Sequence, residues 1–394
     1  MGVVVNMIKM NQKQNCSGCG SCANVCTIQS ILMVEDNEGF LYPQVDVSKC
    51  IDCGLCEKVC PILNKRGSNH TPIAYACINK NENIRLASSS GGVFTIIAED
   101  TINNGGVVFG AGYNDDLKLV HSFVNATVGL AKYRGSKYEQ SIIGETYKQA
   151  KEFLKKNISV LFTGTPCQIG GLYSYLGKEY EKLLCIDIVC HGVPSPKVFK
   201  RYKAVIENRY GAKTKKIAFR RKDAGWKLYN LAISFDNNTE YRNIFTEDIY
   251  MRGFLQNLYL RPSCYYCSFK TIHRQSDLTI ADFWGIENIL PKLDDDKGTS
   301  LILVNSTKGK KVFEGLQDKM IAEEVSVDEA IKFNPSAVRS VQYNSNRDKF
   351  FEKLNSRSGD ISKLILQYTK GSFQKRVYRK TRGILSKVKR KLLH

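Results

Sequence analysis

The alternation of apolar and polar residues predicts two successive structural units. Near the amino terminus, residues 31–35 and 40–45 flank the polar stretch Asp36-Asn37-Glu38-Gly39, which is typical of a β-hairpin with a glycine-containing turn. Beyond it, apolar runs predict strands at 73–78, 107–113, 160–163 and 183–189, and helical stretches are expected at 92–103 and 145–157. Strands that alternate with helices in this way indicate an α/β core.

The pattern is mixed beyond residue 215. Strands are expected at 228–235, 239–241, 278–280 and 301–305, and the chain becomes polar with helical spacing after about residue 345. This half is therefore expected to be α+β. Residues 65–72 are rich in polar and turn-forming residues and predict a linker.

These patterns predict an α+β chain, in which a small amino-terminal domain precedes a larger α/β to α+β domain. The expected divisions are 9–64, a linker at 65–72, a large domain at 73–345 and a helical, basic tail at 346–394. No apolar stretch is long enough to cross a bilayer, and the apolar residues 3–5 are too few for a signal peptide. We therefore expect a cytoplasmic protein.

Cysteine spacing carries the most specific chemical signal. Cysteines in the cytoplasm stay reduced, so regular spacing among the 14 cysteines points to metal ligands rather than disulfides. Eight of them form two equal runs, Cys16-x2-Cys19-x2-Cys22-x3-Cys26 and Cys50-x2-Cys53-x2-Cys56-x3-Cys60.

This doubled register is typical of a bacterial-ferredoxin-like domain with two 4Fe-4S clusters. Three cysteines of one run and the last cysteine of the other hold each cluster. The predicted sets are Cys16, Cys19, Cys22 and Cys60 for the first cluster, and Cys50, Cys53, Cys56 and Cys26 for the second. Pro61 follows Cys60 as the pattern requires, whereas Thr27 replaces the proline after Cys26. Zinc is the alternative, but zinc modules usually show paired cysteines with longer gaps.

Further motifs follow in the larger domain. They are Ser88-Ser89-Ser90-Gly91-Gly92-Val93, Tyr133-Arg134-Gly135-Ser136-Lys137-Tyr138, Gly164-Thr165-Pro166-Cys167-Gln168, Val189-Cys190-His191-Gly192-Val193-Pro194, Cys264-x2-Cys267, and Ala281-Asp282-Phe283-Trp284-Gly285. In this order, behind a ferredoxin unit, they resemble the beta subunit family of coenzyme F420 hydrogenases and dehydrogenases over about residues 16–300. The resemblance implies a domain that binds a flavin, expected to be FAD, and passes electrons between iron-sulfur clusters and a soluble deazaflavin or a comparable acceptor.

Three of these motifs supply the expected flavin-binding residues. The segment 88–92 lies between a strand and a helix, where backbone N–H groups can hold a phosphate, although an ordinary helix cap would have the same sequence. Lys137 could balance a phosphate or a reduced flavin, or lie in solvent. Thr165 follows a strand end, where α/β sheets commonly bind ligands. The expected cofactor residues are Ser88, Ser89, Ser90, Gly91, Gly92, Ser136, Lys137 and Thr165.

The remaining cysteines leave two interpretations open. Cys167, Cys190, Cys264 and Cys267 could hold a third 4Fe-4S cluster, or Cys167 and Cys190 could be small buried residues while the Cys264/Cys267 pair only stabilises a loop. Cys77 and Cys185 lie within apolar strands and are expected in the core. His191 could relay a proton or ligate a metal, or it could be a structural histidine that donates to the backbone. Asp282 and Trp284 could shape the acceptor pocket, or Trp284 could serve packing alone. No residue is assigned a catalytic role.

The formal charge of +20 is partly a property of the carboxy terminus, because nine of the basic residues lie in the last 24. Their spacing with apolar residues is that of a basic amphipathic helix, which could contact an anionic membrane face or an acidic protein, or remain solvated. Nucleic acid is not an expected partner, since no nucleic-acid module is evident.

The sequence therefore predicts an iron-sulfur flavoprotein oxidoreductase. Its clusters would relay electrons to or from a flavin, which exchanges two electrons with a soluble deazaflavin or nicotinamide compound, or with a redox partner protein. A cofactor between clusters and deazaflavin is chemically necessary, because clusters transfer single electrons and a deazaflavin accepts hydride. The alternative is a ferredoxin-like carrier whose larger domain docks a catalytic partner without a flavin.

Overall fold

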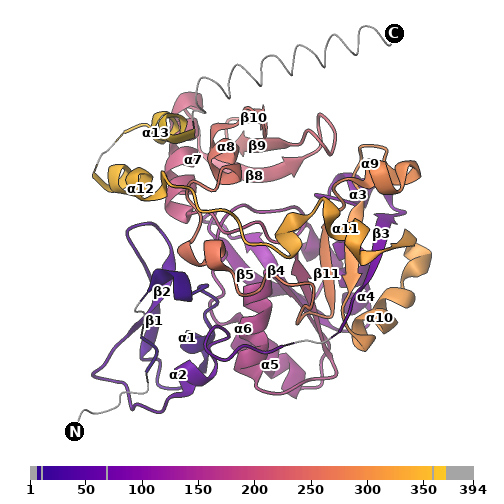
Figure 1. Ribbon diagram of the computed structural model, residues 1–394, viewed down its shortest axis with the longest axis horizontal. Coiled ribbons are helices and arrows are strands. Elements are labelled where there is room, and N and C mark those ends of the chain that lie inside the picture. Colours follow the sequence, from indigo (N-terminus) through magenta and orange to yellow (C-terminus); the bar gives the residue numbers. More distant parts are fainter. Residues whose placement is uncertain (1–6, 10–11, 68–69, 357–358, 370–394) are drawn as a thin grey trace.

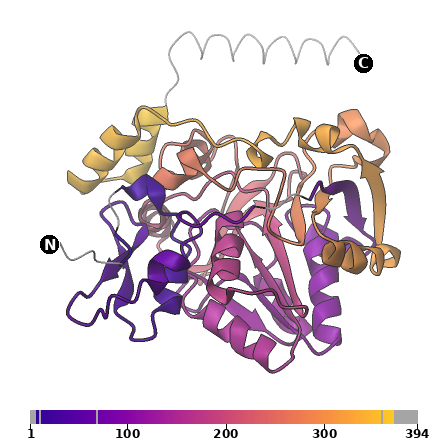
Figure 2. The same ribbon diagram turned by 60° about the horizontal axis from the view of Figure 1, so that its bottom comes forward.

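The computed structural model describes residues 7–9, 12–67, 70–356 and 359–369. The amino-terminal unit is a small lobe beside the rest of the chain, as Figures 1 and 2 show. It contains η1 (Lys13–Asn15), α1 (Ser21–Val25), the antiparallel hairpin β1 (Ile31–Glu35) and β2 (Leu41–Val45), and α2 (Leu55–Lys58). Its small core combines apolar side chains with the cysteines Cys22, Cys26 and Cys56.

An eight-stranded mixed sheet forms the centre of the larger part, in the order β13-β3-β12-β11-β7-β6-β4-β5. The strands are β3 (Ile73–Asn79), β4 (Val107–Tyr113), β5 (Leu119–Val124), β6 (Val160–Gly164), β7 (Leu183–Ile188), β11 (Leu278–Asp282), β12 (Ser300–Val304) and β13 (Met320–Val325). The four central strands β4, β6, β7 and β11 are parallel, and the outer pairs are antiparallel. The carboxyl ends of the parallel strands therefore meet at one edge, where α/β sheets bind ligands.

Helices cover both faces of this sheet. Apolar residues of α4 (Val93–Asn103) and α10 (Thr307–Glu314) form one core with the sheet, and those of α5 (Thr146–Lys155) and α6 (Pro166–Leu176) form another. Helix α6 begins at a capping box in which Thr165 and Gln168 satisfy each other's backbone groups. The remaining short helices around the sheet are α3 (Glu82–Leu86), η2 (Thr127–Lys132), α9 (Ile286–Ile289), η4 (Pro291–Leu293), η5 (Gln317–Lys319), α11 (Val327–Lys332) and η6 (Pro335–Ala337).

A second, three-stranded antiparallel sheet lies beside the central one. It comprises β8 (Thr214–Arg221), β9 (Asn230–Phe235) and β10 (Glu240–Ile244), and it packs with α7 (Pro196–Tyr210), α8 (Ile249–Leu255), η3 (Pro262–Tyr266), α12 (Arg347–Ser356) and α13 (Ile361–Thr369). This core also takes in Phe40 and Tyr42 of the amino-terminal hairpin. The amino-terminal lobe is therefore fixed to the larger part through shared apolar packing, and α12 and α13 belong to the same core.

The expected α+β class, with a small amino-terminal unit and a larger α/β part, is confirmed. The predicted strands correspond to β1 to β4, β6, β7 and β9 to β12, and the predicted helices to α4 and α5. The sequence did not predict β5, β8 and β13. No helix in the described ranges is long and apolar enough to cross a membrane. Most of the predicted basic tail, from residue 370, lies outside the described residues.

Candidate active site

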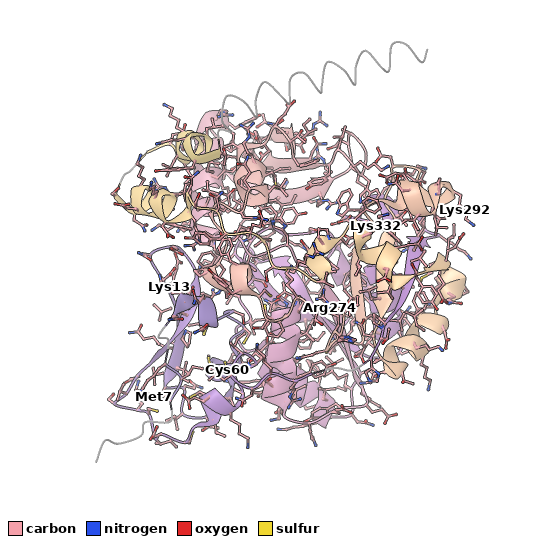
Figure 3. The ribbon with its side chains drawn as sticks, viewed as in Figure 1. Met7, Lys13, Cys60, Arg274, Lys292 and Lys332 are labelled. Carbon is pink, nitrogen blue, oxygen red and sulfur yellow. The ribbon has the colours of Figure 1, made fainter. Side chains whose placement is uncertain are left out.

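Four cysteines of the amino-terminal unit line one cavity of about 170 Å³. They are Cys16, Cys19, Cys22 and Cys60, the set that the sequence predicts for the first cluster; Figure 3 labels Cys60 in this lobe. Burial raises the pKa of the Cys22 thiol well above its usual range, and repulsion from the three neighbouring cysteines raises it further. Metal replaces the protons of such thiols on binding, so this buried donor set fits a 4Fe-4S cluster.

The second predicted set is more open to solvent. Cys53 is exposed, Cys50 and Cys26 are half-buried, and Cys56 is buried. The Cys56 sulfur accepts a 3.2 Å hydrogen bond from the Ile8 backbone N–H. Burial raises the pKa of Cys26, but hydrogen bonds from Ser30 outweigh this and lower it. Such hydrogen bonds stabilise a thiolate, which is the form that ligates iron.

In the described part of the chain, no three His, Cys, Asp or Glu side chains converge closely enough to hold a single metal ion. A cubane is larger than one ion, and its four ligands surround four irons rather than one. The cysteine spacing and the cavity lined by Cys16, Cys19, Cys22 and Cys60 are what make the two amino-terminal sets candidate cluster sites.

The structure also brings together the four predicted cysteines of the larger part. Cys167 lies in the first turn of α6, Cys190 follows β7, and Cys264 and Cys267 lie at η3. Burial raises the pKa of Cys167 well above its usual range, and repulsion from the other three cysteines raises it further. We call Cys167, Cys190, Cys264 and Cys267 the cysteine quartet. Its four thiols come from three separate elements and lie close enough to repel one another. Cys77 and Cys185, in contrast, are fully buried in the core.

Helix α6 connects the quartet to the first cluster cavity. Cys167 begins this helix, and Gly171 follows one turn later, about 6 Å along the helix axis. The Ser21 hydroxyl donates a 2.8 Å hydrogen bond to the Gly171 carbonyl. A Cβ atom at Gly171 would lie only 2.9 Å from the Cβ of Cys19. The two cysteine sites thus approach the same helix one turn apart.

A pocket of about 650 Å³ opens at the carboxyl ends of β6, β7 and β11. Cys190 and His191 form part of its wall, together with Thr163 and Asp282 from the strand ends. Its volume is within the range of cofactor sites, and it lies at the sheet edge where such sites are expected. Because Cys190 also belongs to the quartet, the pocket and the quartet are adjacent.

The segment 88–92 leads into α4 and forms one side of this pocket. Gly92 is the N-cap of α4, has a φ of 84°, and provides no side-chain cap. Gly91 lies so close to the sheet that a Cβ would be 2.3 Å from the Cys77 carbonyl oxygen. Gly92, Val93 and Phe94 line the pocket, and the first N–H groups of a helix have no partner within the helix. Such groups bind phosphate.

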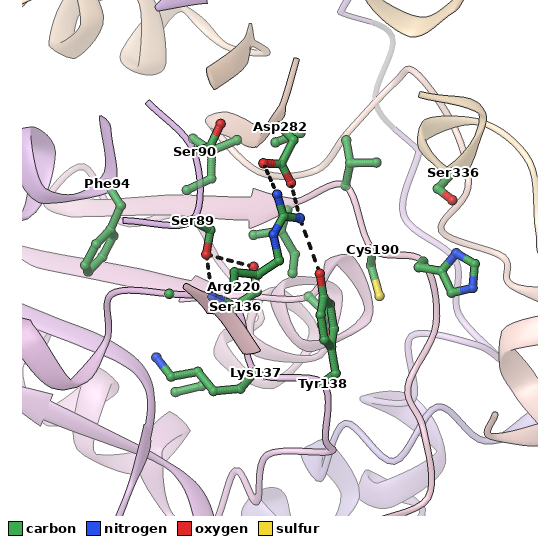
Figure 4. Close-up of a pocket in the computed structure, with 18 of the residues that line it drawn as sticks. Ser89, Ser90, Phe94, Ser136, Lys137, Tyr138, Cys190, Arg220, Asp282 and Ser336 are labelled. Atoms are coloured by element: carbon green, nitrogen blue, oxygen red, sulfur yellow. Dashed lines mark hydrogen bonds and ion pairs between the residues drawn. The ribbon is translucent and has the colours of Figure 1, made fainter. Parts of the chain in front are cut away.

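The serine hydroxyls of this segment are already engaged. Ser88 donates to the Ile84 carbonyl, Ser90 donates to the Thr299 carbonyl, and Ser89 accepts from both the backbone and the hydroxyl of Ser136, as Figure 4 shows for the last pair. These contacts fix the loop shape. Ser88 and Ser90 thus donate within the protein, whereas Ser89 only accepts, so the donors left for a phosphate are backbone N–H groups and the Ser89 hydroxyl.

Lys137 and Thr165 line the same pocket. The Lys137 amine donates hydrogen bonds of 3.0 Å to the Lys132 and Arg134 carbonyls, and burial lowers its pKa to about 7. The Thr165 hydroxyl is 3.1 Å from the Cys167 sulfur and caps α6. Seven of the eight sequence-predicted cofactor residues therefore line one pocket, with Lys137 facing carbonyl groups and Thr165 facing the quartet. Gly91 does not line it, because it is packed against the sheet.

An ion pair that the sequence did not predict lies in the pocket wall. Arg220 donates two hydrogen bonds of 2.8 Å to the Asp282 carboxylate (Figure 4). The same carboxylate also accepts a 2.7 Å bond from the Trp226 indole. Trp284 stacks on Trp226 at a centroid distance of 4.9 Å. In the sequence, only the motif Asp282-Phe283-Trp284 indicated a site here. The partners of Asp282, Arg220 on β8 and Trp226 in the following loop, lie far from it along the chain, so the sequence did not predict the pair.

Two buried nitrogen atoms of the pocket lack a hydrogen-bond partner among the described residues: Nε of Arg220 and Nδ1 of His121. Burial lowers the pKa of His121 to about 4, so the ring is neutral at pH 7. Buried polar atoms are nearly always hydrogen-bonded, and unpaired ones at a pocket indicate a ligand. These atoms and the open start of α4 fit a polar, phosphate-bearing cofactor such as FAD.

Comparison with known proteins finds two matching regions in the chain. Residues 15–63 match the family model of the 4Fe-4S dicluster domain, so the chain is an iron-sulfur electron-transfer protein. Residues 158–330 match the family model for the carboxy terminus of the coenzyme F420 hydrogenase/dehydrogenase beta subunit. The chain thus joins a region that matches the 4Fe-4S dicluster domain to a region that matches the carboxy terminus of the coenzyme F420 hydrogenase/dehydrogenase beta subunit, and this combination indicates an electron-transfer oxidoreductase.

Among solved structures, the chain is similar to one from the xenon-derivatized F420-reducing [NiFe] hydrogenase complex of Methanosarcina barkeri. The identity is 13%, the TM-score is 0.47, and the match covers 72% of this chain and 92% of the other. None of the curated proteins matches the sequence.

Proposed function

We propose that this protein is an iron-sulfur flavoprotein oxidoreductase that exchanges two electrons with a soluble compound such as coenzyme F420. Cys190 carries the proposal, because its side chain belongs to the cysteine quartet and also lines the 650 Å³ pocket. A one-electron site therefore adjoins a cavity large enough for a two-electron cofactor.

A bound flavin would supply the conversion between one-electron and two-electron transfer. The residues of the chain would hold it. The amino-terminal N–H groups of α4 would bind phosphate, and the loop at 88–92 keeps them accessible. Lys222 anchors this loop, since its amine donates hydrogen bonds of 2.8 Å to the Arg85 carbonyl and 2.7 Å to the Ser90 carbonyl.

The Arg220–Asp282 pair, which lies beside Ser89 and Ser90 in the pocket wall (Figure 4), would orient the reactive end of the cofactor. Arg220 is fixed by Asp282 and packs over the Trp284 ring at 5.2 Å, so its guanidinium is held in one orientation. Such a fixed cation can stabilise negative charge on a reduced ring. Its unpaired Nε and the unpaired Nδ1 of the neutral His121 ring are the nitrogen atoms that can bond to a ligand.

We propose that the quartet holds a third 4Fe-4S cluster. Burial and mutual repulsion disfavour the thiolate form of its four cysteines, and bound iron offsets both costs because it supplies positive charge. The quartet would receive electrons from the first cluster across α6. Gly171 of this helix packs against Cys19 of the first cluster set, and Cys167 of the quartet lies one helical turn before Gly171.

The outer end of the relay would meet a redox partner protein. Exposed Cys53 places the second cluster set next to solvent. Because α12 and α13 of the predicted tail 346–394 pack into the core, we further propose that its basic part from Gly371 onward contacts an acidic protein or an anionic membrane surface from the cytoplasmic side. Its test is co-sedimentation with anionic liposomes, and unchanged binding after deletion from Gly371 would exclude the membrane contact.

The cofactor content of the anaerobically purified protein tests the proposal. A visible spectrum, iron and sulfide analysis, and chromatography of acid-released cofactor should give about twelve irons and one flavin, counting four irons per cluster. About eight irons would exclude the third cluster. Iron with no flavin retained or rebound would indicate the carrier without a flavin, and zinc in place of iron would reject the whole scheme.

A further inference from the structure

Arg261 is the most completely buried arginine among the described residues, with no exposed surface. The other four buried arginines each pair with a carboxylate: Arg85 with Asp295, Arg220 with Asp282, Arg274 with Asp187, and Arg347 with Glu38. No carboxylate in the described part of the chain pairs with Arg261. A buried charge without a countercharge is strongly destabilising, so a negative group is expected next to it.

The neighbours of Arg261 are the first cluster cavity and the hairpin. Its guanidinium donates hydrogen bonds to the carbonyls of Cys16 and Leu41, at 2.8 and 3.0 Å, and to the side-chain oxygen of Gln140, at 3.0 Å. One guanidinium nitrogen is 3.6 Å from the Cys16 sulfur. The Tyr42 ring lies 4.2 Å from the guanidinium carbon. The charge therefore points at a cluster ligand, while every oxygen acceptor around it is neutral.

Arg261 also lies next to the quartet. It is the N-cap of η3, which carries Cys264 three residues later, and its backbone N–H donates to the Val193 carbonyl at 2.8 Å. The positive charge of Arg261 favours the thiolate form of Cys264 as well as that of Cys16. One cation thus lies between the two cysteine sites that α6 also connects.

We propose that Arg261 is a positioning residue that raises the reduction potential of the cluster held by Cys16, Cys19, Cys22 and Cys60. When this cluster takes one electron from a one-electron donor, the donor is oxidised and one negative charge is added beside the guanidinium. The cation stabilises that added charge in a site of low dielectric. Electrons that enter at the exposed second cluster therefore collect at the first, next to the larger part.

The inference rests on the amino-terminal clusters of the proposed function and does not need the flavin. The test is a redox titration of the full chain with dithionite, monitored by electron paramagnetic resonance. Arg261→Gln removes the charge and should lower the reduction equilibrium constant of one amino-terminal cluster about tenfold, which is about 59 mV for one electron. Arg261→Lys keeps the charge and should restore most of the potential.

Two further variants complete the test. Arg85→Gln removes a buried guanidinium that bonds to Gly298 and Asp295 and to none of the proposed cluster ligands. Its partner Asp295 is 45% exposed, so the cluster potentials should not change. Gln140→Glu leaves Arg261 in place but pairs it with a carboxylate, so the reduction potential of the first cluster should fall. This variant tests the inference if Arg261→Gln does not fold.

Unchanged potentials in Arg261→Gln, or in Gln140→Glu where only that variant folds, would overturn the inference. A wild-type protein without amino-terminal clusters would overturn both this inference and the proposed function. A shifted potential in a protein without flavin would support the inference and reject the flavin proposal alone.

Discussion

The Ser21 hydroxyl donates a 2.8 Å hydrogen bond to the carbonyl of Gly171, and this contact joins the first cysteine loop to helix α6. The approach requires glycine, because a Cβ at position 171 would lie 2.6 Å from the Ser21 oxygen and 2.9 Å from the Cys19 Cβ. Both sides of the junction carry cysteines of the proposed relay. Close packing here is therefore a condition for electron transfer between the two parts.

Gly171→Ala should destabilise this junction. Overpacking in a close-packed interface typically costs about 1–3 kcal/mol. The free energy of unfolding should fall by this amount in denaturant titration, and cluster occupancy in the amino-terminal lobe should fall with it. Gly315→Ala is the control, since its Cβ would be no closer than 3.4 Å to the nearest neighbouring atom, the Lys311 carbonyl oxygen. Equal stability of the two variants would contradict the packing argument.

Cys167→Ser should remove about four irons per chain if the quartet holds a third cluster. The spectra of the two amino-terminal clusters should remain, because their ligands are unchanged. Cys185→Ala serves as the control, since Cys185 is fully buried on β7 within the apolar core. Iron analysis would refute the third cluster if Cys167→Ser kept the wild-type iron content.

Asp282→Asn should weaken both the fold and flavin retention. It leaves the buried Arg220 guanidinium without its countercharge, and breaking a buried pair in this way costs about 3–5 kcal/mol. Glu240→Gln breaks the half-exposed pair with Arg221 and should cost only about 0–1 kcal/mol. Thermal unfolding and flavin fluorescence after gel filtration measure the two effects. Similar losses in both variants would show that Asp282 has no special role.

Glu139 gives a prediction for pH. Burial raises the pKa of its carboxyl from 4.5 to about 8, against the opposing effects of Tyr113 and Lys203. Between these two pH values the native state keeps a proton that the unfolded chain releases. The contribution of the Glu139 carboxyl to the free energy of unfolding is therefore fully present below about pH 4.5 and is lost as the pH rises to about 8. Glu139→Gln should flatten the decline between about pH 5 and pH 8 in denaturation midpoints.

Exposed Glu152 is the matched control for Glu139. Its pKa is lowered by the hydrogen bond from Lys155, so Glu152→Gln should leave the decline between about pH 5 and pH 8 as in the wild type. If the Glu139 and Glu152 variants have the same pH profile as the wild type, then Glu139 is ionised in the native state.

The sequence predicted those features that short spacing encodes. The two cysteine runs, the hairpin at β1 and β2, and most strands of the central sheet could be recognised because their residues are close along the chain. Strand β8 was not predicted, since its sequence Thr214–Arg221 is dominated by charged residues, one of which, Arg220, is buried against Asp282. Such a partner could not be inferred before the sheet order was known.

The convergence of the cysteine quartet likewise depends on topology. Cys167 and Cys190 are brought together because β6 and β7 are parallel neighbours, and Cys264 joins them through η3. The sequence left this set open between cluster ligands and core residues. Arg261 gave no signal at all, because an arginine beside a proline resembles any surface residue until its burial is seen.

The central claim is that a flavin in the 650 Å³ pocket connects two-electron chemistry to the clusters. The most direct measurement adds reduced coenzyme F420 anaerobically to the oxidised protein, with and without its flavin, and follows the clusters by electron paramagnetic resonance. The account predicts that signals of reduced clusters appear only in the flavin-loaded protein. Equal cluster reduction in the flavin-free protein would contradict it.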